Sequence, residues 1–81
     1  MSSSDSPTAL PAIAMRKAIR RAAGRSLADL AAKLQVSRQS VSFWERGLIE
    51  PAGAHLGEYA RLLEDLRKEA AETLAATEAA S

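Results

Sequence analysis

The stretch LADLAAKLQVSRQSVSFWERG, residues 27–47, decides the fold of this chain. Its apolar residues recur every three to four positions, which predicts two short helices, 27–34 and 38–46, joined by about three residues. In the first helix Leu27, Leu30 and Leu34 face inward. Ala31 lies between them, and its small side chain allows a second helix to cross closely. The stretch therefore predicts a pair of tightly crossing helices.

Short polar residues and a glycine mark the ends of these two helices. Ser26 and Asp29 form a capping-box pattern before the first helix, in which the hydroxyl accepts a hydrogen bond from the amide three residues later. Ser37 is a good N-cap for the second helix, and Gly47 marks its end. We expect Trp44, three residues after Val41, to lie in the core.

Outward from this stretch, the pattern remains helical. A first helix is expected to begin between residues 9 and 12 and to end at Gly24. Its expected inner face consists of Ala12, Met15, Ile19, Ala22 and Ala23. A fourth helix is expected from about Ala54, with apolar positions at Leu56, Tyr59, Ala60, Leu63, Leu66, Ala70 and Leu74. Since no strand pattern occurs, the predicted class is all-α.

The two sides of the segment 38–46 differ in chemistry. On a helical wheel, one side is expected to pack inward: Ser37, Ser40, Val41, Trp44 and Leu48. The other side projects: Arg38, Gln39, Ser42, Phe43 and Arg46. Arginine can pair with guanine, glutamine with adenine, and serine with a base edge or a phosphate. Phe43 can contact a thymine methyl group, the edge of the core, or another protein. The projecting side therefore suits the major groove of DNA.

The formal net charge of +1 conceals a strong asymmetry. Residues 16–46 carry a net charge of +6, whereas residues 50–81 carry −4. A cationic segment points to a polyanionic partner. Because the acidic half cancels much of this charge, we expect modest non-specific DNA affinity with a shallow salt dependence.

The segment Ser37–Gly47 resembles the recognition helix of the Cro/phage-repressor-type helix-turn-helix proteins, the XRE family. Leu30 and Ala31 stand at the family's second-helix position. Residues matching its fourth helix are Pro51, Leu56, Tyr59, Ala60 and Leu63, so the resemblance covers roughly residues 13–63. It implies a compact four-helix, lambda-repressor-like domain that binds double-stranded DNA. It further implies a bacterial or phage transcription regulator, most often a repressor, acting as a homodimer.

The resemblance also assigns roles to residues. It implies base contacts by Arg38, Gln39, Ser42 and Phe43. We expect phosphate contacts from Ser26, Ser37, Arg46 and Arg25. Arg20 and Glu45 occupy positions that commonly form a salt bridge between the first and third helices.

Three positions depart from the family pattern. Leu27 replaces a glutamine at the start of the second helix, which weakens one expected phosphate contact. Gln35 replaces the glycine of the turn, and a left-handed conformation there costs up to about 1–2 kcal/mol. The loop Leu48-Ile49-Glu50 replaces a loop that is often basic, and its acid would repel phosphate.

The predicted organisation has three parts: a disordered tail (1–10), a helix-turn-helix domain (11–63) and a helical extension (64–81). The extension stands where the family has a fifth helix. Its stripe of Leu66, Ala70 and Leu74 is expected to form a dimer or partner interface. An alternative function follows from this stripe: an adaptor or antitoxin-type interaction protein whose acidic C-terminal helix binds a protein partner.

Composition excludes several other classes. The 81 residues can bury one small core, and they contain no nucleophile–base arrangement, so we do not expect an enzyme. With no cysteine and one histidine, no metal site is expected. We expect no cofactor, no membrane segment, and a cytoplasmic, nucleoid-associated protein.

Overall fold

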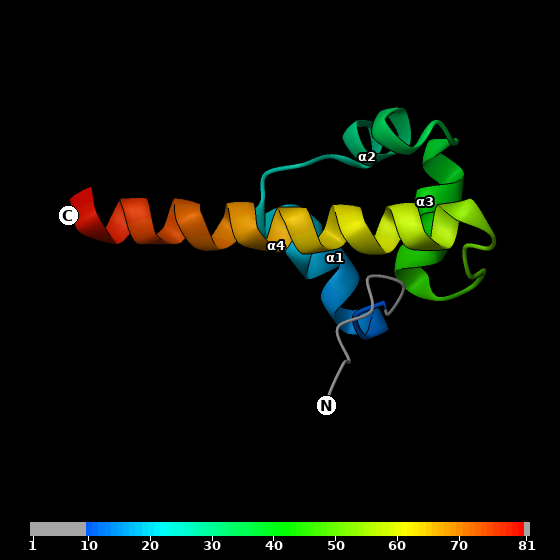
Figure 1. The fold of residues 1–81 in the computed structure, drawn as a ribbon, viewed down its shortest axis with the longest axis horizontal. Coiled ribbons are helices and arrows are strands. Elements are labelled where there is room, and N and C mark those ends of the chain that lie inside the picture. Colours follow the sequence, from blue (N-terminus) through cyan, green and yellow to red (C-terminus); the bar gives the residue numbers. More distant parts are fainter. Residues whose placement is uncertain (1–9, 81) are drawn as a thin grey trace.

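The computed structural model describes the backbone of residues 10–80 and the side chains of residues 10–75. Within this range the helices are α1 (Ile13–Ala22), α2 (Leu27–Leu34), α3 (Arg38–Arg46) and α4 (Ala54–Ala80). The long α4 lies along one side of the three shorter helices (Figure 1). The predicted all-α class is therefore confirmed. Residues 1–9 of the predicted tail lie outside the described residues, and Leu10 packs against the core.

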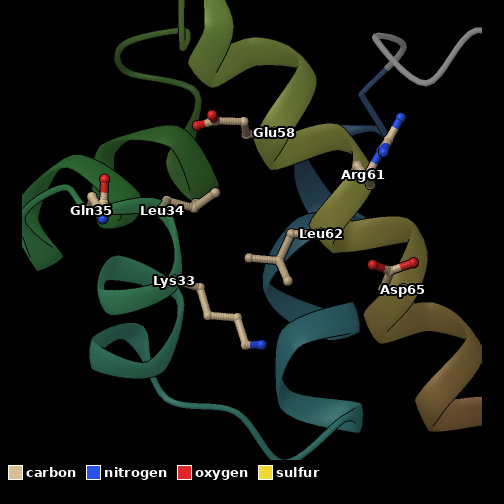
Figure 2. A pocket seen from close by; sticks show the side chains of 7 residues that line it. All are labelled: Lys33, Leu34, Gln35, Glu58, Arg61, Leu62 and Asp65. Carbon is tan, nitrogen blue, oxygen red and sulfur yellow. The ribbon is translucent and has the colours of Figure 1, made fainter.

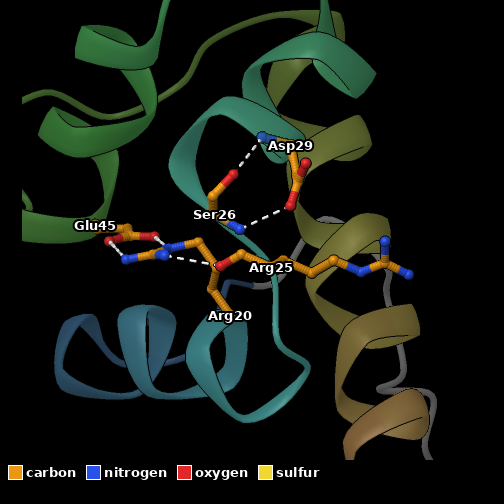
Figure 3. Close-up of polar contacts among 5 residues, drawn as sticks. All are labelled: Arg20, Arg25, Ser26, Asp29 and Glu45. Atoms are coloured by element: carbon orange, nitrogen blue, oxygen red, sulfur yellow. Dashed lines mark hydrogen bonds and ion pairs between the residues drawn. The ribbon is translucent and has the colours of Figure 1, made fainter.

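Local caps set the ends of α2 and α3 where the sequence predicted them. The Ser26 hydroxyl accepts a hydrogen bond from the Asp29 amide at 3.0 Å, and the Asp29 carboxylate accepts one from the Ser26 amide at 2.8 Å (Figure 3). The backbone and hydroxyl hydrogen bonds of Ser26 hold the pKa of the Asp29 carboxyl below its usual range. Ser37 caps α3 by accepting from the Ser40 amide at 3.1 Å.

Two left-handed residues turn the chain at the ends of these helices. Gln35 ends α2 with φ 58° and ψ 46°, the conformation that usually favours glycine. Gly47 ends α3 with φ 74°. The Gln35 turn brings Ser37 into position to start α3, so that α2 and α3 pack against each other. Ala31 is buried in this pair, as its small size predicts.

The core is built around Trp44 of α3. Its ring lies 5.1 Å from the ring of Tyr59 and 5.9 Å from that of His55, both on α4. Val41 and Tyr59 are fully buried, and Leu30 and Leu63 close the cluster from α2 and α4. These contacts fix α3 against α4, and they confirm the predicted inward orientation of Val41 and Trp44.

The predicted inner face of α1 is largely wrong. Ile19 is buried as expected and Ala23 is partly buried, but Ala12, Met15 and Ala22 are exposed. Their expected place is taken by two arginines, Arg16 and Arg20, which are buried and hydrogen-bonded to groups on other segments. Because their charges are satisfied there, α1 packs on α3 through a mainly polar seam.

The core continues along α4 beyond the predicted domain boundary at residue 63. Leu66 is 2% exposed and belongs to the same cluster as Leu63, and Ala70 is 9% exposed. The C-terminal end of α4 then projects past the other helices (Figure 1). Leu66 is thus part of the domain. Among the residues the structure describes, no helix is long and apolar enough to span a membrane.

Candidate nucleic-acid interface

The outer side of α3 carries the four side chains predicted to contact bases. Arg38 and Gln39 are exposed, whereas Ser42 and Phe43 are half-buried. The opposite side of the helix holds the buried Val41. Since the inner side is fixed to the core, the outer side is presented on a rigid element.

Two residues assigned to the inner side of α3 are exposed. Ser37 is exposed because it is the N-cap, and its hydroxyl is used by the Ser40 amide. Leu48 is exposed because the left-handed Gly47 ends the helix before it. The predicted inward orientation of these two side chains is therefore wrong, since both residues lie outside α3, where the helical wheel does not apply.

Arg46 and Phe43 form a pair on the outer side of α3. The guanidinium carbon of Arg46 lies 5.5 Å from the centre of the Phe43 ring, within the range of a cation–π contact. The two residues are three positions apart, which places them on the same helix face. The ring therefore holds the cation of Arg46 beside the predicted base-contacting residues.

The two predicted phosphate contacts at the start of α2 are both engaged within the chain. The Ser26 hydroxyl accepts the Asp29 amide. Arg25 donates to the Glu69 carboxylate on α4 at 2.9 Å, and this hydrogen bond raises the pKa of the guanidinium. The Arg25 side chain points toward α4 and away from Arg20 (Figure 3). The positive charge of Arg25 is thus directed to α4 rather than to α3.

The salt bridge implied between α1 and α3 is present. Two nitrogens of the Arg20 guanidinium donate to the two Glu45 oxygens, and a third donates to the Arg25 carbonyl at 2.9 Å (Figure 3). Both side chains are buried. This pair connects α1, α3 and the turn before α2, and so fixes the angle at which α3 is presented.

Arg16 is a second buried arginine, with a role that the sequence reading missed. It donates to the Trp44 carbonyl and to the Pro11 carbonyl, each at 2.9 Å. Its spacing of four residues from Arg20 places both on one face of α1, and this spacing is the signal that could have identified it. Arg16 thus satisfies backbone carbonyl groups inside the fold, and it is not part of the cationic surface of segment 16–46.

Internal pairing reduces the positive charge available to a ligand. Arg16 and Arg20 are buried, and Arg25 is paired with Glu69. The exposed cations of residues 16–46 are Lys17, Arg21, Lys33, Arg38 and Arg46. The surface formed by residues 16–46 therefore carries less positive charge than the number of arginine and lysine residues in this segment suggests.

The predicted interface on α4 is wrong at two of its three residues. Leu66 and Ala70 pack inside the chain's own core, so they cannot pair with another molecule without unfolding it. Leu74 is 64% exposed. The three residues do form an apolar stripe, as predicted, but α1 and α2 cover most of this stripe.

A hollow of about 350 Å³ lies between α2 and α4 (Figure 2). Leu34 and Leu62 form its apolar part. Its charged lining consists of Lys33, Arg61, Glu58 and Asp65. The charges of opposite sign balance, and none of the lining residues belongs to α3.

A family model described as helix-turn-helix matches residues 17–69, about two thirds of the chain. No curated protein and no solved structure matches the chain significantly. The matched range begins within α1 and ends within α4, and it contains the whole α2–α3 unit. The chain therefore belongs to the helix-turn-helix family of the Cro/repressor (XRE) type, and it is a DNA-binding transcription regulator.

Proposed function

We propose that the protein is a sequence-specific transcription regulator that acts as a repressor. It reads the major groove of double-stranded DNA as a homodimer. The observation that carries this proposal is the two-sided α3. Arg38 and Gln39 are exposed on a helix whose opposite side, with Val41, is fully buried. A rigid helix with free arginine and glutamine side chains matches the donor and acceptor pattern of base edges.

The two residues near the start of α3 have the most specific chemistry. Arg38 can bond the O6 and N7 atoms of guanine, and Gln39 can bond the N6 and N7 atoms of adenine. Ser42 lies one turn further and can reach a base edge or a phosphate. Repression then follows from occupancy, because a protein bound at a promoter excludes polymerase from the same DNA.

The end of α3 supplies a second kind of contact. Phe43 is half-buried and can place its ring against a thymine methyl group, which is the apolar feature of the major groove. Arg46, held over this ring, can bond the adjacent phosphate. The Ser26 and Ser37 hydroxyls, used as caps, can still accept or donate one further hydrogen bond each. Arg25 would first have to leave Glu69.

Footprinting on DNA from upstream of the protein's own gene tests this function. We expect a protected site, and we expect the double substitution Arg38→Ala/Gln39→Ala to remove it, at a cost of about 1–3 kcal/mol per bidentate contact. Lys68→Ala is the matched control, because it removes the same charge from the exposed surface of α4. A protein that shows no specific footprint at low salt, or a double variant that binds like wild type, would contradict the proposal.

A second candidate function is supported by the C-terminal part of α4, which projects past the other helices. Leu74 is 64% exposed on the projecting part of an acidic helix, which suits an adaptor or antitoxin-type protein with a protein partner. The two functions are compatible on one chain. A stable complex that co-purifies with the wild type and is lost in Leu74→Glu, with DNA binding retained, would establish it; a complex that survives this substitution would not.

A further inference from the structure

We propose that Arg16 is a positioning residue for DNA reading: its buried guanidinium holds the last turn of α3 in the orientation in which Phe43 and Arg46 meet the DNA. Arg16 does not touch the DNA itself, and it acts through the backbone of α3. The inference rests on the proposed function in one respect, namely that the outer side of α3 reads DNA. It gives a role in reading to a residue of α1, outside the α2–α3 unit.

The Arg16 guanidinium joins three segments that are distant in the chain. Its Nε atom donates a hydrogen bond to the Pro11 carbonyl before α1, and its Nη1 atom donates one to the Trp44 carbonyl in α3, each at 2.9 Å. The same Nη1 atom lies 3.6 Å from a carboxylate oxygen of Glu50, in the loop after α3. The Arg16 side chain is 7% exposed, so these partners take the place of water around its charge.

The Trp44 carbonyl is one of the groups at which α3 ends. It also accepts a hydrogen bond from the Gly47 amide at 3.3 Å, while the Phe43 carbonyl accepts one from the Leu48 amide at 3.0 Å. These two bonds form a Schellman motif, a common helix end that uses a left-handed glycine. A carbonyl oxygen can accept two hydrogen bonds, so Arg16 takes the second acceptor position of Trp44. Its charge is also favourable at the C-terminal end of a helix.

The last turn of α3 carries two of the side chains predicted to contact DNA. Phe43 is half-buried and Arg46 is exposed, and the guanidinium carbon of Arg46 lies 5.5 Å from the centre of the Phe43 ring. The backbone of this turn therefore determines where the ring and the charge meet the DNA. Because helix ends fray, the turn is less well ordered when the Schellman bonds alone hold it. Arg16 adds a charged hydrogen bond at this end.

The start of α3, where Arg38 is exposed, is held by different groups. There the Ser37 hydroxyl accepts a hydrogen bond from the Ser40 amide at 3.1 Å, about two helical turns from Trp44. We therefore expect Arg16 to influence the two ends of α3 unequally. This difference separates a positioning role from a general contribution to stability, which would affect the contacts of the whole helix alike.

Amide hydrogen exchange of the full chain tests the link between Arg16 and α3 without DNA. In Arg16→Met the Gly47 and Leu48 amides should exchange about tenfold faster than in wild type, because a charged hydrogen bond at this helix end is lost. The Asp29 amide, in the cap of α2, should keep its wild-type rate. Arg21→Met is the matched control, since it removes the same charge from the exposed side of α1. Equal acceleration of all three amides in Arg16→Met, or none, would overturn the proposal.

The loss of affinity caused by replacing single base pairs of the selected site tests the effect on reading. Phe43→Ala and Arg38→Ala first identify the base pairs read by the two ends of α3, as the positions at which each variant no longer discriminates. In Arg16→Met we expect discrimination at the Phe43 position to fall from about fourfold to nearly none, and discrimination at the Arg38 position to remain. Arg21→Met should keep both. Equal loss at the two positions in Arg16→Met, or retention of both, would overturn the proposal.

A second variant serves if Arg16→Met does not fold. Arg16→Lys keeps the charge, but its single ammonium group cannot occupy the positions of both Nε and Nη1. We expect the same pattern to a smaller extent, with faster exchange of the Gly47 and Leu48 amides and weaker discrimination at the Phe43 position. Wild-type values of both quantities in Arg16→Lys would overturn the proposal.

The outcomes separate this inference from the proposed function. If Phe43→Ala discriminates like wild type at every base pair, the last turn of α3 does not read DNA, and the positioning role falls while reading through Arg38 stands. If wild type selects no DNA sequence, the proposed function fails, and hydrogen exchange alone decides whether Arg16 holds the end of α3.

Discussion

Arg20 and Glu45 face each other across the seam between α1 and α3, with two guanidinium nitrogens on two carboxylate oxygens. Their side chains are 9% and 5% exposed. At this burial both charges have lost most of their contact with solvent, so each depends on the other for stability. Arg20 also donates a hydrogen bond to the Arg25 carbonyl, and this bond connects the turn before α2 to the ion pair.

Removing one member of this pair should therefore destabilise the fold strongly. Arg20→Met leaves Glu45 buried without its partner, and we expect a loss of about 3–5 kcal/mol. Urea unfolding followed by the fluorescence of Trp44, the single tryptophan, measures it. In Arg20→Met/Glu45→Leu we expect a smaller loss than the sum of the two single losses. Strict additivity would show that the two residues are not coupled.

The turn between α2 and α3 contains a strained residue whose replacement should stabilise the protein. Gln35 is the described non-glycine residue with positive φ, at 58°. Glycine carries no Cβ, so Gln35→Gly should raise the free energy of unfolding by about 1 kcal/mol. Gln35→Ala, which keeps a Cβ, serves as the control in the same unfolding experiment. Equal stability of the two variants would argue against strain at this turn.

The sequence predicted the ends of α2 and α3 correctly because these ends are set locally. Ser26, Ser37 and Gly47 act on groups within four residues, so neighbours in the chain suffice to place them. Trp44 was likewise assigned to the core from its spacing. The outer side of α3 followed from the same periodicity.

Arg46 should contribute to DNA binding mainly through its charge. If it contacts a phosphate, Arg46→Gln weakens binding similarly on all sequences and lowers the slope of log affinity against log salt by about 1. Anisotropy titrations at several salt concentrations measure the slope. Arg61→Gln removes an exposed cation from α4 and should leave it unchanged. An identical slope for the two variants would place Arg46 away from the phosphates.

Phe43 should make the protein sensitive to a single methyl group. Replacing thymine by uracil in the selected site removes the methyl, and wild type should lose about 0.8 kcal/mol, or roughly fourfold in affinity, at the contacted base. Phe43→Ala should bind both DNAs equally, whereas Ser42→Ala should retain the difference. Discrimination that persists in Phe43→Ala would assign the methyl contact to another residue.

The features that the sequence did not predict depend on contacts between distant segments. The inner face of α1 was misassigned because Arg16 and Arg20 are buried only where the Trp44 carbonyl and Glu45 receive them. Leu66 was assigned to an interface because its burial depends on how α1 and α2 pack on α4. Periodicity shows that a face is apolar, but not which surface covers it.

The continuity of α4 gives the molecule a rigid arm. Its 27 residues span roughly 40 Å, and they run from the aromatic cluster around Trp44 to Ala80 without a break in the helix. The first part of this rod is clamped by Leu63 and Leu66. Any domain joined in helical register to its far end would keep a set distance and rotation relative to α3, so that one added residue would turn it by about 100° around the rod.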